Sequence, residues 1–406
     1  MKTIIELCEE NLIDQYKRIE DIAFFNSRKV IQAFQDNRIS TQHFAPTTGY
    51  GYDDVGRDTL GRVFAQIFGC EDAIVSPHIT CGSHALSVAL FAILRPADTM
   101  LSISSRPYDT LNDTIFSQGT NNLGTLEDFN IKYEQVDLID GKFDFDEIKK
   151  QCLILKPKVV FIQRSRGYSE RSALSTHDIE KACKAVRETS INTTIIVDNC
   201  YGEFLEKLEP TQVGADLAVG SMIKNPGGGL APTGAYFAGK KDVIEKVAAR
   251  ITSPSLLTEV GSYAMGYRLF YQGLFMAPSI VASAVKGAYL IGEVMTKLGY
   301  SCFPKSNENS YDIIKSIHFN TSEELIKFVQ CIQKYSPIDS YVLPLPWDMP
   351  GYTDQVIMAA GTFVSGASIE MSCDSPIKEP YIAYFQGALT YEHAKVVAES
   401  LANSFY

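Results

Sequence analysis

The chain has 406 residues, of which 45% are hydrophobic and 21% charged, the composition of a folded protein large enough for two or three domains. Its 37 Lys and Arg are outnumbered by 48 Asp and Glu, which gives a formal net charge of −11. Nucleic acids and anionic membrane surfaces both require a positively charged face, and no basic cluster occurs here. The composition therefore argues against both kinds of partner.

The N-terminus predicts neither a leader peptide nor a membrane anchor. Glu6, Glu9 and Glu10 occupy the stretch that is apolar in a signal peptide. The run 86–94 is the longest apolar segment, and it has only about half the length that spans a bilayer. Nine scattered cysteines without a CxxC pair indicate reduced thiols rather than a disulfide framework or a zinc site. We therefore expect a cytoplasmic protein without a structural metal.

Apolar residues at helical spacing between 4 and 33 predict an amphipathic N-terminal helix. A loop rich in Thr, Pro and Gly follows, and then a helix at 60–68. Beyond it, short β-branched runs alternate with helical stretches, which is typical of a mostly parallel sheet with helices on both faces. The predicted strands are 73–75, 100–103, 131–136, 159–163, 194–197 and 217–219, with helices that include 84–94 and 177–188.

A long helical zone at 256–298 separates this region from a C-terminal part of mixed strands and helices. We therefore predict an N-terminal helical segment (1–45) at the domain junction, a large α/β domain (46–255), connecting helices (256–298) and a small C-terminal α/β domain (299–406). The Pro-rich segment 337–350 lies in the last of these. Trp347, Asp348 and Tyr352 in and beside it form either the lip of a pocket or an ordinary loop.

Two strands of the predicted sheet end next to side chains that could bind a ligand or react with it. Ligands of open parallel sheets bind outside the carboxyl ends of the strands. Asp198 ends one such strand, and its alternative role is that of a helix N-cap. Lys224 follows another strand, within a turn of Asn225, Pro226 and three glycines. A lysine in an apolar pocket can form a Schiff base, whereas most lysines are merely solvated.

Two more signals come from other strand ends. Gly82, Ser83 and His84 begin a helix, so their free N–H groups form either an anion site suited to phosphate or an ordinary cap. Tyr108 follows another strand and could cover the face of a flat ligand, although tyrosines are common in loops. Together the four signals supply a phosphate cradle, a stacking ring, a carboxylate for a ring nitrogen and a lysine for an aldehyde. Pyridoxal phosphate requires this set of groups.

The order of these features resembles the fold type I pyridoxal-phosphate enzymes, in particular the Cys/Met-metabolism branch of cystathionine and methionine lyases. Within that branch, the chain is most similar to the methionine γ-lyase-like, or aluminium-resistance, proteins related to cystathionine β-lyase. The resemblance runs from about residue 20 to the C-terminus. The segments that carry it are 50–69, 197–204, 220–236, 363–376 and 384–393.

The resemblance implies a role for each matching residue. The Schiff-base lysine of the family falls on Lys224, the pyridinium partner on Asp198 and the stacking aromatic on Tyr108. A serine that reaches the phosphate falls on Ser221, three residues before the lysine. The phosphate turn falls on Cys81, Gly82 and Ser83.

A second subunit also contributes to the site in these relatives. There, a Tyr and an Arg of the neighbouring chain clamp the phosphate, and the corresponding residues here are Tyr50 or Tyr52, and Arg57. The resemblance therefore implies a homodimer, or a homotetramer built as a dimer of dimers, with shared active sites.

The sequence departs from the family pattern at two positions. Ile223 precedes the lysine, where the lyases usually have Thr. The arginine that binds the substrate carboxylate would fall at about Ala383, and a bidentate arginine is hard to replace. Either Arg164 or Arg166, at the end of a predicted strand, takes over this role, or the substrate is not a simple amino acid.

The sequence therefore predicts a pyridoxal-phosphate-dependent carbon–sulfur lyase that acts on a sulfur-containing amino acid by β- or γ-elimination. In this hypothesis Lys224 removes the Cα proton and Tyr108 protonates the leaving group. The alternatives on the same cofactor are replacement, racemisation, transamination and a non-catalytic stress or carrier role. Less favoured are a thiol hydrolase that uses Cys81 or Cys200 with His84, and a metal site at His78 and His84.

Overall fold

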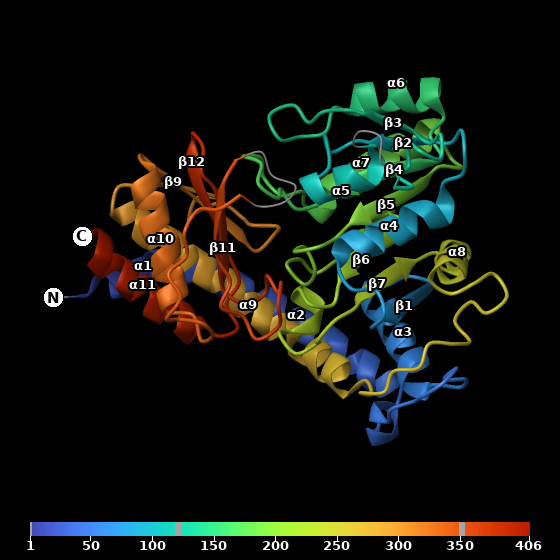
Figure 1. Ribbon diagram of the computed structural model, residues 1–406, viewed down its shortest axis with the longest axis horizontal. Helices are drawn as coiled ribbons and strands as arrows, with labels where there is room; N and C mark the ends of the chain where they lie inside the picture. Colours follow the sequence, from blue (N-terminus) through green and yellow to red (C-terminus); the bar gives the residue numbers. More distant parts are fainter. Residues whose placement is uncertain (1, 118–122, 349–353) are drawn as a thin grey trace.

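The structure is a computed structural model that describes residues 2–117, 123–348 and 354–406. It has two lobes, and a long helix, α9 (Arg268–Lys297), runs through the junction between them (Figure 1). The predicted N-terminal helix is in fact two helices, α1 (Ile4–Asn11) and α2 (Ile13–Asp36), which break at Leu12. Helix α2 packs along α9, so the N-terminal segment lies at the junction of the lobes.

The large lobe contains a seven-stranded sheet in the order β1-β7-β6-β5-β4-β2-β3. The five neighbouring strands β6, β5, β4, β2 and β3 are parallel to one another, whereas β7 is antiparallel to both of its neighbours, β1 and β6. All six predicted strands form, and β7 was not predicted. The strands are β1 (Asp72–Ser76), β2 (Thr99–Ser102), β3 (Lys132–Gln135), β4 (Val159–Gln163), β5 (Thr194–Asp198), β6 (Leu217–Ser221) and β7 (Ala235–Gly239).

Helices cover both faces of this sheet, as the continuous apolar strands predict. In β4, Phe161 packs against the helices of one face, and Val160 and Ile162 pack against those of the other. The first face carries α4 (Gly82–Ile93), α5 (Asp109–Ile115) and α8 (Lys241–Ile251), and the second carries α6 (Phe145–Leu155) and α7 (Thr176–Thr189). Helix α3 (Val55–Phe68) packs on β1, and the 3-10 turns are η1 (Thr41–Phe44), η2 (Pro210–Val213) and η3 (Asn225–Gly227).

Helix α9 is apolar around most of its circumference because it is packed on several sides. Its composition and its 30 residues would allow it to cross a membrane, but 67% of its most apolar window is buried inside the fold. The predicted helical zone at 256–298 is wrong at its N-terminal end, since residues 256–267 form turns and the helix begins at Arg268.

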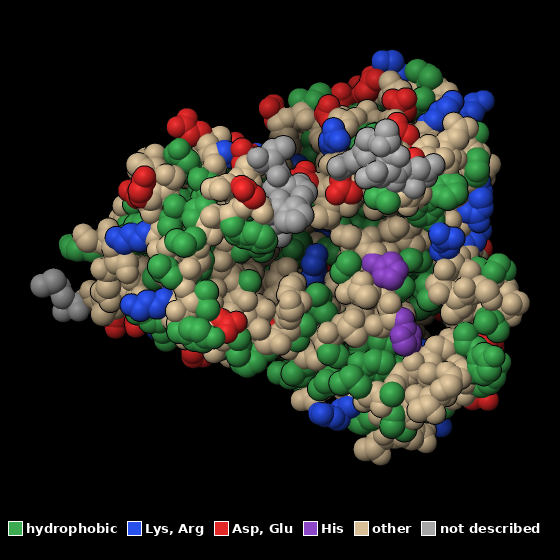
Figure 2. Space-filling model, in the orientation of Figure 1, with side chains coloured by type: hydrophobic (Ala, Val, Ile, Leu, Met, Phe, Trp, Pro, Cys, Tyr) green, Lys and Arg blue, Asp and Glu red, His purple; other side chains and the backbone are tan. Residues whose placement is uncertain are grey.

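The small lobe contains an antiparallel five-stranded sheet in the order β10-β11-β12-β9-β8. One face packs on α9, α10 (Ser322–Lys334) and α11 (Tyr391–Phe405), and the other is turned to the large lobe. Figure 2 shows the molecule hollowed between the lobes, with a basic side chain in the hollow. The strands are β8 (Ser301–Phe303), β9 (Ile314–Phe319), β10 (Val356–Ala359), β11 (Ser372–Pro376) and β12 (Tyr381–Gln386).

The described part of the Pro-rich segment, residues 337–348, reaches this second sheet through Trp347. Trp347 forms an isolated antiparallel bridge with Val356, and half of its side chain is exposed. Tyr352 lies outside the described residues, so its predicted place in a pocket lip stays a prediction.

Candidate active site

Three parallel strands of the large sheet, β4, β5 and β6, end at the same edge. Predicted site residues lie at or just after the ends of these strands. Gln163 ends β4 and lies directly opposite Asp198, the last residue of β5, while Ser221 ends β6. The turn that carries Lys224 begins right after β6. The carboxyl edge of the sheet is where ligands of such folds bind.

The turn before α4 meets the lysine turn at this edge. A methyl group built on Gly82 would lie 3.2 Å from Cys200 Sγ and 3.8 Å from both Lys224 Nζ and Ser221 Cβ. Gly82 therefore borders the space that Lys224 and Cys200 line. Cys81 is the N-cap of α4, and its sulfur accepts a hydrogen bond from the backbone N–H of His84 at 3.5 Å. The predicted phosphate turn and the predicted Schiff-base lysine thus lie next to one another.

Tyr108 is tied to the same turn. Its hydroxyl lies 2.9 Å from Ser83 Oγ, and Ser83 Oγ is also 3.0 Å from Thr110 Oγ1. The backbone N–H of Tyr108 donates to Gln163 Oε1 at 2.8 Å. The sequence did not single out Gln163, although it ends a strand in the same way as Asp198. The predicted phosphate turn, Tyr108 and Gln163 at the end of β4 therefore form one connected group.

Lys224 lies against an aromatic ring that the sequence analysis missed. Its Nζ is 4.1 Å from the centre of the Tyr201 ring, in the range of a cation–π contact. Tyr201 has a φ of 70° and its hydroxyl is 2.9 Å from Ser368 Oγ of the small lobe. Burial disfavours the charged ammonium, but the nearby Asp198 carboxylate favours it, and the pKa of Lys224 is held well above its ordinary value.

The neighbouring groups respond to the same environment. Burial raises the pKa of Asp198 above its usual value, and this effect is opposed by Lys224 and by the backbone N–H of Cys200, 3.1 Å from Asp198 Oδ1. Burial, together with the charge of Asp198, also raises the pKa of Tyr108. The Tyr108 hydroxyl therefore keeps its proton at neutral pH, and the Asp198 carboxylate is poorly solvated and suited to a cationic partner.

Arg164, one of the two arginines considered for substrate binding, is buried and binds groups of the protein itself. It is fully buried, donates to Asn199 Oδ1 at 2.7 Å and to Gly202 O at 2.8 Å, and forms an ion pair with Glu206 at 2.7 Å. A methyl group on Gly202 would lie 2.6 Å from this guanidinium. The prediction that Arg164 binds substrate is therefore wrong, because its donors are used to hold the turn after β5.

Arg166 is the remaining candidate of the pair. Its Nη2 donates to the carbonyl oxygens of Phe303 at 3.1 Å and Ile314 at 2.6 Å, so it links the two lobes. Its Nε and Nη1 have no hydrogen-bond partner among the described residues, and Asp312 is 4.0 Å from Nε. Arg166 therefore keeps free donors, although only 2% of the residue is exposed.

Ala383, the position expected for the family arginine, faces away from the site. It lies in the core on the α9 side of β12, whereas Ile382 and Tyr384 face the large lobe. Because side chains alternate along a strand, no side chain at 383 could reach the cleft.

Tyr50, Tyr52 and Arg57 form a separate group within the single chain. Tyr50 and Tyr52 are 65% and 57% exposed, and their rings are stacked with centres 5.3 Å apart. Arg57 Nη1 donates to Gly51 O at 2.9 Å, and a methyl group on Gly51 would lie 2.8 Å from Ser262 Cα. Their described contacts do not include Lys224, so their role in a phosphate clamp stays a prediction about a second subunit.

The geometry does not support the two less favoured hypotheses, a thiol hydrolase and a metal site at His78 and His84. Burial raises the pKa of the Cys200 thiol well above its ordinary value, which makes it a poor nucleophile at neutral pH. His78 Nε2 lies 2.9 Å from Ser262 O, and His84 Nδ1 lies 3.3 Å from Thr80 N, so each imidazole has its own local partner. Among the described residues, no group of three or more His, Cys, Asp or Glu could hold a metal ion.

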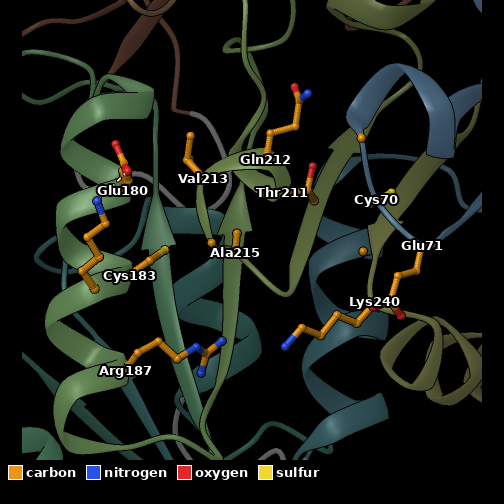
Figure 3. Close-up of a pocket in the computed structure, with 14 residues that line it drawn as sticks. Cys70, Glu71, Glu180, Cys183, Arg187, Thr211, Gln212, Val213, Ala215 and Lys240 are labelled. Carbon is orange, nitrogen blue, oxygen red and sulfur yellow. Dashed lines mark hydrogen bonds and ion pairs between the residues drawn. The ribbon is translucent and has the colours of Figure 1, made fainter.

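A cavity of about 490 Å³ lies at the opposite edge of the sheet, where β5 and β6 begin (Figure 3). Arg187 and Lys240 point toward one another across it, and both pair with the buried Asp216. Asp216 also accepts from the backbone N–H of Ile195 at 2.7 Å. These charged side chains therefore stabilise the starts of β5 and β6. The cavity is separate from the residues around Lys224.

The residues at the carboxyl edge fit pyridoxal phosphate. Gly82 leaves open a cradle that a Cβ would narrow beside Lys224, Ser83 and Tyr108 supply hydroxyls there, and Asp198 supplies a buried carboxylate. The family model for methionine gamma-lyase matches residues 1–406. The chain belongs to the methionine gamma-lyase family. This membership implies pyridoxal phosphate as the cofactor.

Two relatives illustrate the family. An uncharacterized protein of Bacillus subtilis (strain 168) is 47% identical over 395 residues, which cover 97% of this chain and 93% of the relative. A solved structure described as a carbon-sulfur lyase involved in aluminum resistance, from Clostridium novyi NT, is 48% identical with a TM-score of 0.95. That match covers 99% of this chain and 95% of the other.

The fold extends beyond these relatives. A pyridoxal-5'-phosphate dependent protein of Escherichia coli is only 15% identical, yet it aligns with a TM-score of 0.62 over 96% of this chain and 97% of its own. The predicted fold class, an α/β protein of the fold type I class with a mostly parallel seven-stranded sheet and a small C-terminal α/β domain, is confirmed.

Proposed function

We propose that the protein is a pyridoxal-phosphate-dependent carbon–sulfur lyase that acts on a sulfur-containing amino acid by β- or γ-elimination. The observation that carries the proposal is the approach of the Gly82 turn to Lys224, 3.8 Å from a methyl group at Gly82 to Nζ, beside the buried Asp198. The name of the Clostridium novyi relative supports the same reaction class.

The residues of the site divide the work of holding the cofactor. Lys224 is the group that binds the aldehyde, and Asp198 would bind the protonated ring nitrogen. Ser83, Ser221 and the first N–H groups of α4, beside Cys81 and Gly82, would bind the phosphate, since a helix N-terminus favours an anion. Tyr108 would cover one face of the ring.

When bound, pyridoxal phosphate supplies an electron sink for negative charge at the substrate Cα. Lys224 Nζ is the group placed to take up and return the Cα proton. The Tyr108 hydroxyl, whose raised pKa keeps it protonated, is a source of a proton for the departing sulfur. Arg166, whose Nε and Nη1 have no hydrogen-bond partner among the described residues, is the candidate for binding the substrate carboxylate.

We also propose that a second copy of the chain completes the site, with Tyr50 or Tyr52, and Arg57, reaching the phosphate of the partner. The exposure of the stacked tyrosines in the single chain supports this arrangement. Mixing equal amounts of inactive Lys224→Ala chains and inactive Arg57→Ala chains should restore up to a quarter of the activity, because half of the dimers are then mixed and one of the two shared sites in each mixed dimer is intact. If no activity returns, the clamp is not shared.

The test of the function is an absorption spectrum of the purified protein before and after addition of L-cystathionine, L-methionine or L-cysteine, with oxo acid measured in parallel. A visible cofactor band that shifts with one of these compounds, together with oxo acid, is the expected result. Lys224→Ala should lose turnover and the covalent link to the cofactor, whereas Lys246→Ala, on the exposed side of α8, should keep both. An active Lys224→Ala variant would refute the proposal, and a band that moves with none of these compounds would favour a carrier role.

A further inference from the structure

The face of the small sheet that is turned to the large lobe is partly polar. Ile314, Ile382 and Tyr384 form a small apolar cluster on this face, and Tyr201 of the large lobe packs against it. Ile382 and Tyr384 alternate with Ala383, which belongs to the core on the other face. The face therefore borders the residues around Lys224, through Tyr201.

Asp374 of β11 lies on this face, because it is paired directly across from Tyr384 of β12. Its Oδ2 accepts hydrogen bonds from the Tyr168 hydroxyl at 3.0 Å and from Gln386 Nε2 at 3.4 Å. Its Oδ1 is buried and has no hydrogen-bond partner among the described residues. Burial raises the pKa of Asp374 to about 6, an effect that the Tyr168 hydroxyl reduces.

A buried carboxylate oxygen without a partner costs free energy, so its presence needs an explanation. Both donors to Asp374 are uncharged, and a cation is the partner that compensates a buried carboxylate most effectively. Gln386 and Tyr384 come from the neighbouring strand and Tyr168 from the loop after β4. The carboxylate thus lies where the two lobes meet and has one buried acceptor without a partner among the described residues.

The position of Asp374 relative to Lys224 indicates which part of a ligand it would meet. The Tyr201 ring contacts Lys224 Nζ on one side and the cluster containing Tyr384 on the other. Asp374 is paired across from Tyr384 of that cluster, so Tyr201 and Tyr384 connect it to Lys224 through successive contacts. A group bound to it would be at the far end of the side chain of a substrate whose Cα lies near Lys224.

We infer that Asp374 is a specificity-determining residue that binds an ammonium group at the far end of the substrate. This inference rests on the proposed function, and it narrows the substrate class to sulfur amino acids whose leaving thiol carries a primary amine. A substrate with an uncharged alkyl thiol would leave Asp374 Oδ1 unpaired, as it is in the free protein.

The test compares two probes of equal length, S-(2-aminoethyl)-L-cysteine and S-propyl-L-cysteine, which differ only in the terminal ammonium group. Binding is measured by calorimetry with the cofactor-loaded protein in a Lys224→Ala background, so that neither probe is consumed. In this background Asp374 should favour the aminoethyl probe at least about tenfold, the value of one charge-assisted hydrogen bond. Adding Asp374→Asn, which keeps the shape, should remove most of that preference, and Asp242→Asn on the surface should not.

Equal affinity for the two probes, or a preference that survives Asp374→Asn, would overturn the inference. Pyruvate release by the wild-type enzyme with both probes tests the lyase proposal separately. An ammonium preference without pyruvate release would retain Asp374 as the binding residue and refute β-elimination, the reaction that releases pyruvate from cysteine derivatives. Pyruvate release at equal efficiency from both probes would support the lyase and refute the role of Asp374 in binding an ammonium group. The wild-type comparison needs no substitution, so equal efficiency with the two probes would overturn the inference even if Asp374→Asn does not fold.

Discussion

Glu203, a buried carboxyl behind the lysine turn, makes the stability of the protein depend on pH. It is completely buried, accepts a hydrogen bond from the Tyr236 hydroxyl at 2.9 Å on Oε1, and its Oε2 has no partner among the described residues. Burial raises its pKa from 4.5 to about 8, and the nearby Glu209 adds to the effect. The folded protein therefore holds a proton that the unfolded chain has already released at neutral pH.

The sign and the size of the effect follow from linkage. The stability associated with the Glu203 proton is fully present below its unfolded pKa of 4.5 and is lost as the pH rises through about 8. Between about pH 5.5 and about pH 7.5, the loss amounts to about 2.5 kcal/mol at 1.36 kcal/mol per pKa unit. With the usual unfolding entropy per residue for 406 residues, this corresponds to about 3 °C in Tm.

Glu203→Gln removes the titration and keeps the shape, so the stability of the variant relative to wild type should rise by about that amount between these two pH values. Thermal and urea denaturation of both proteins, each with cofactor bound, measure this difference. Glu245→Gln, on the exposed side of α8, controls for the loss of one carboxylate. Parallel stability–pH profiles for wild type and Glu203→Gln would refute the assignment of a buried, protonated Glu203.

Three further perturbations address the residues around the site. Arg164→Met leaves Glu206 without its buried cation and should lower the free energy of unfolding by about 3–5 kcal/mol, so a urea midpoint close to that of wild type would contradict the network described here. Gly220→Ala should cost about 1–3 kcal/mol and lower the Tm, because its Cβ would lie 2.4 Å from both Glu203 Oε1 and Tyr236 Cε1. An unchanged Tm would show that β6 can shift. Tyr108→Ala should weaken binding of pyridoxal phosphate about tenfold in equilibrium dialysis, whereas Tyr108→Phe, which keeps the ring, should change it far less, and equal losses would argue against stacking.

Part of the candidate site could be predicted because the ends of strands can be recognised in a sequence. Asp198 and Lys224 each follow a short apolar run, and the carboxyl edge of a parallel sheet collects whatever polar residues come next. The same rule would have found Gln163, which ends β4 opposite Asp198. Tyr201 could not be found in this way, since its contact with Lys224 depends on the fold of the turn after β5 and on Ser368 of the small lobe.

Arg164 and Arg166 show where local reasoning ends. They are two residues apart at the end of one strand, and the sequence gives no basis for choosing between them. In the folded chain, Arg164 is enclosed by the turn after β5, whereas Arg166 reaches the backbone of the small lobe. The surroundings of each come from segments far away in the chain, so the difference arises only when the lobes are packed together.

The sequence by itself determined the fold class and singled out Lys224 and Asp198 as candidate cofactor-binding residues, because both inferences depend on local patterns: apolar strands alternating with helices, and polar residues just beyond them. The tertiary structure decided which side chains face the cleft. Ala383 and Tyr384 are neighbours in the chain but lie on opposite faces of β12. Asp374 gained its place opposite Tyr384, and its unpaired Oδ1, only through strand pairing and the contact between lobes. Such burial is a property of the assembled fold, because no single segment creates the low-dielectric surroundings that make an unpaired carboxylate informative.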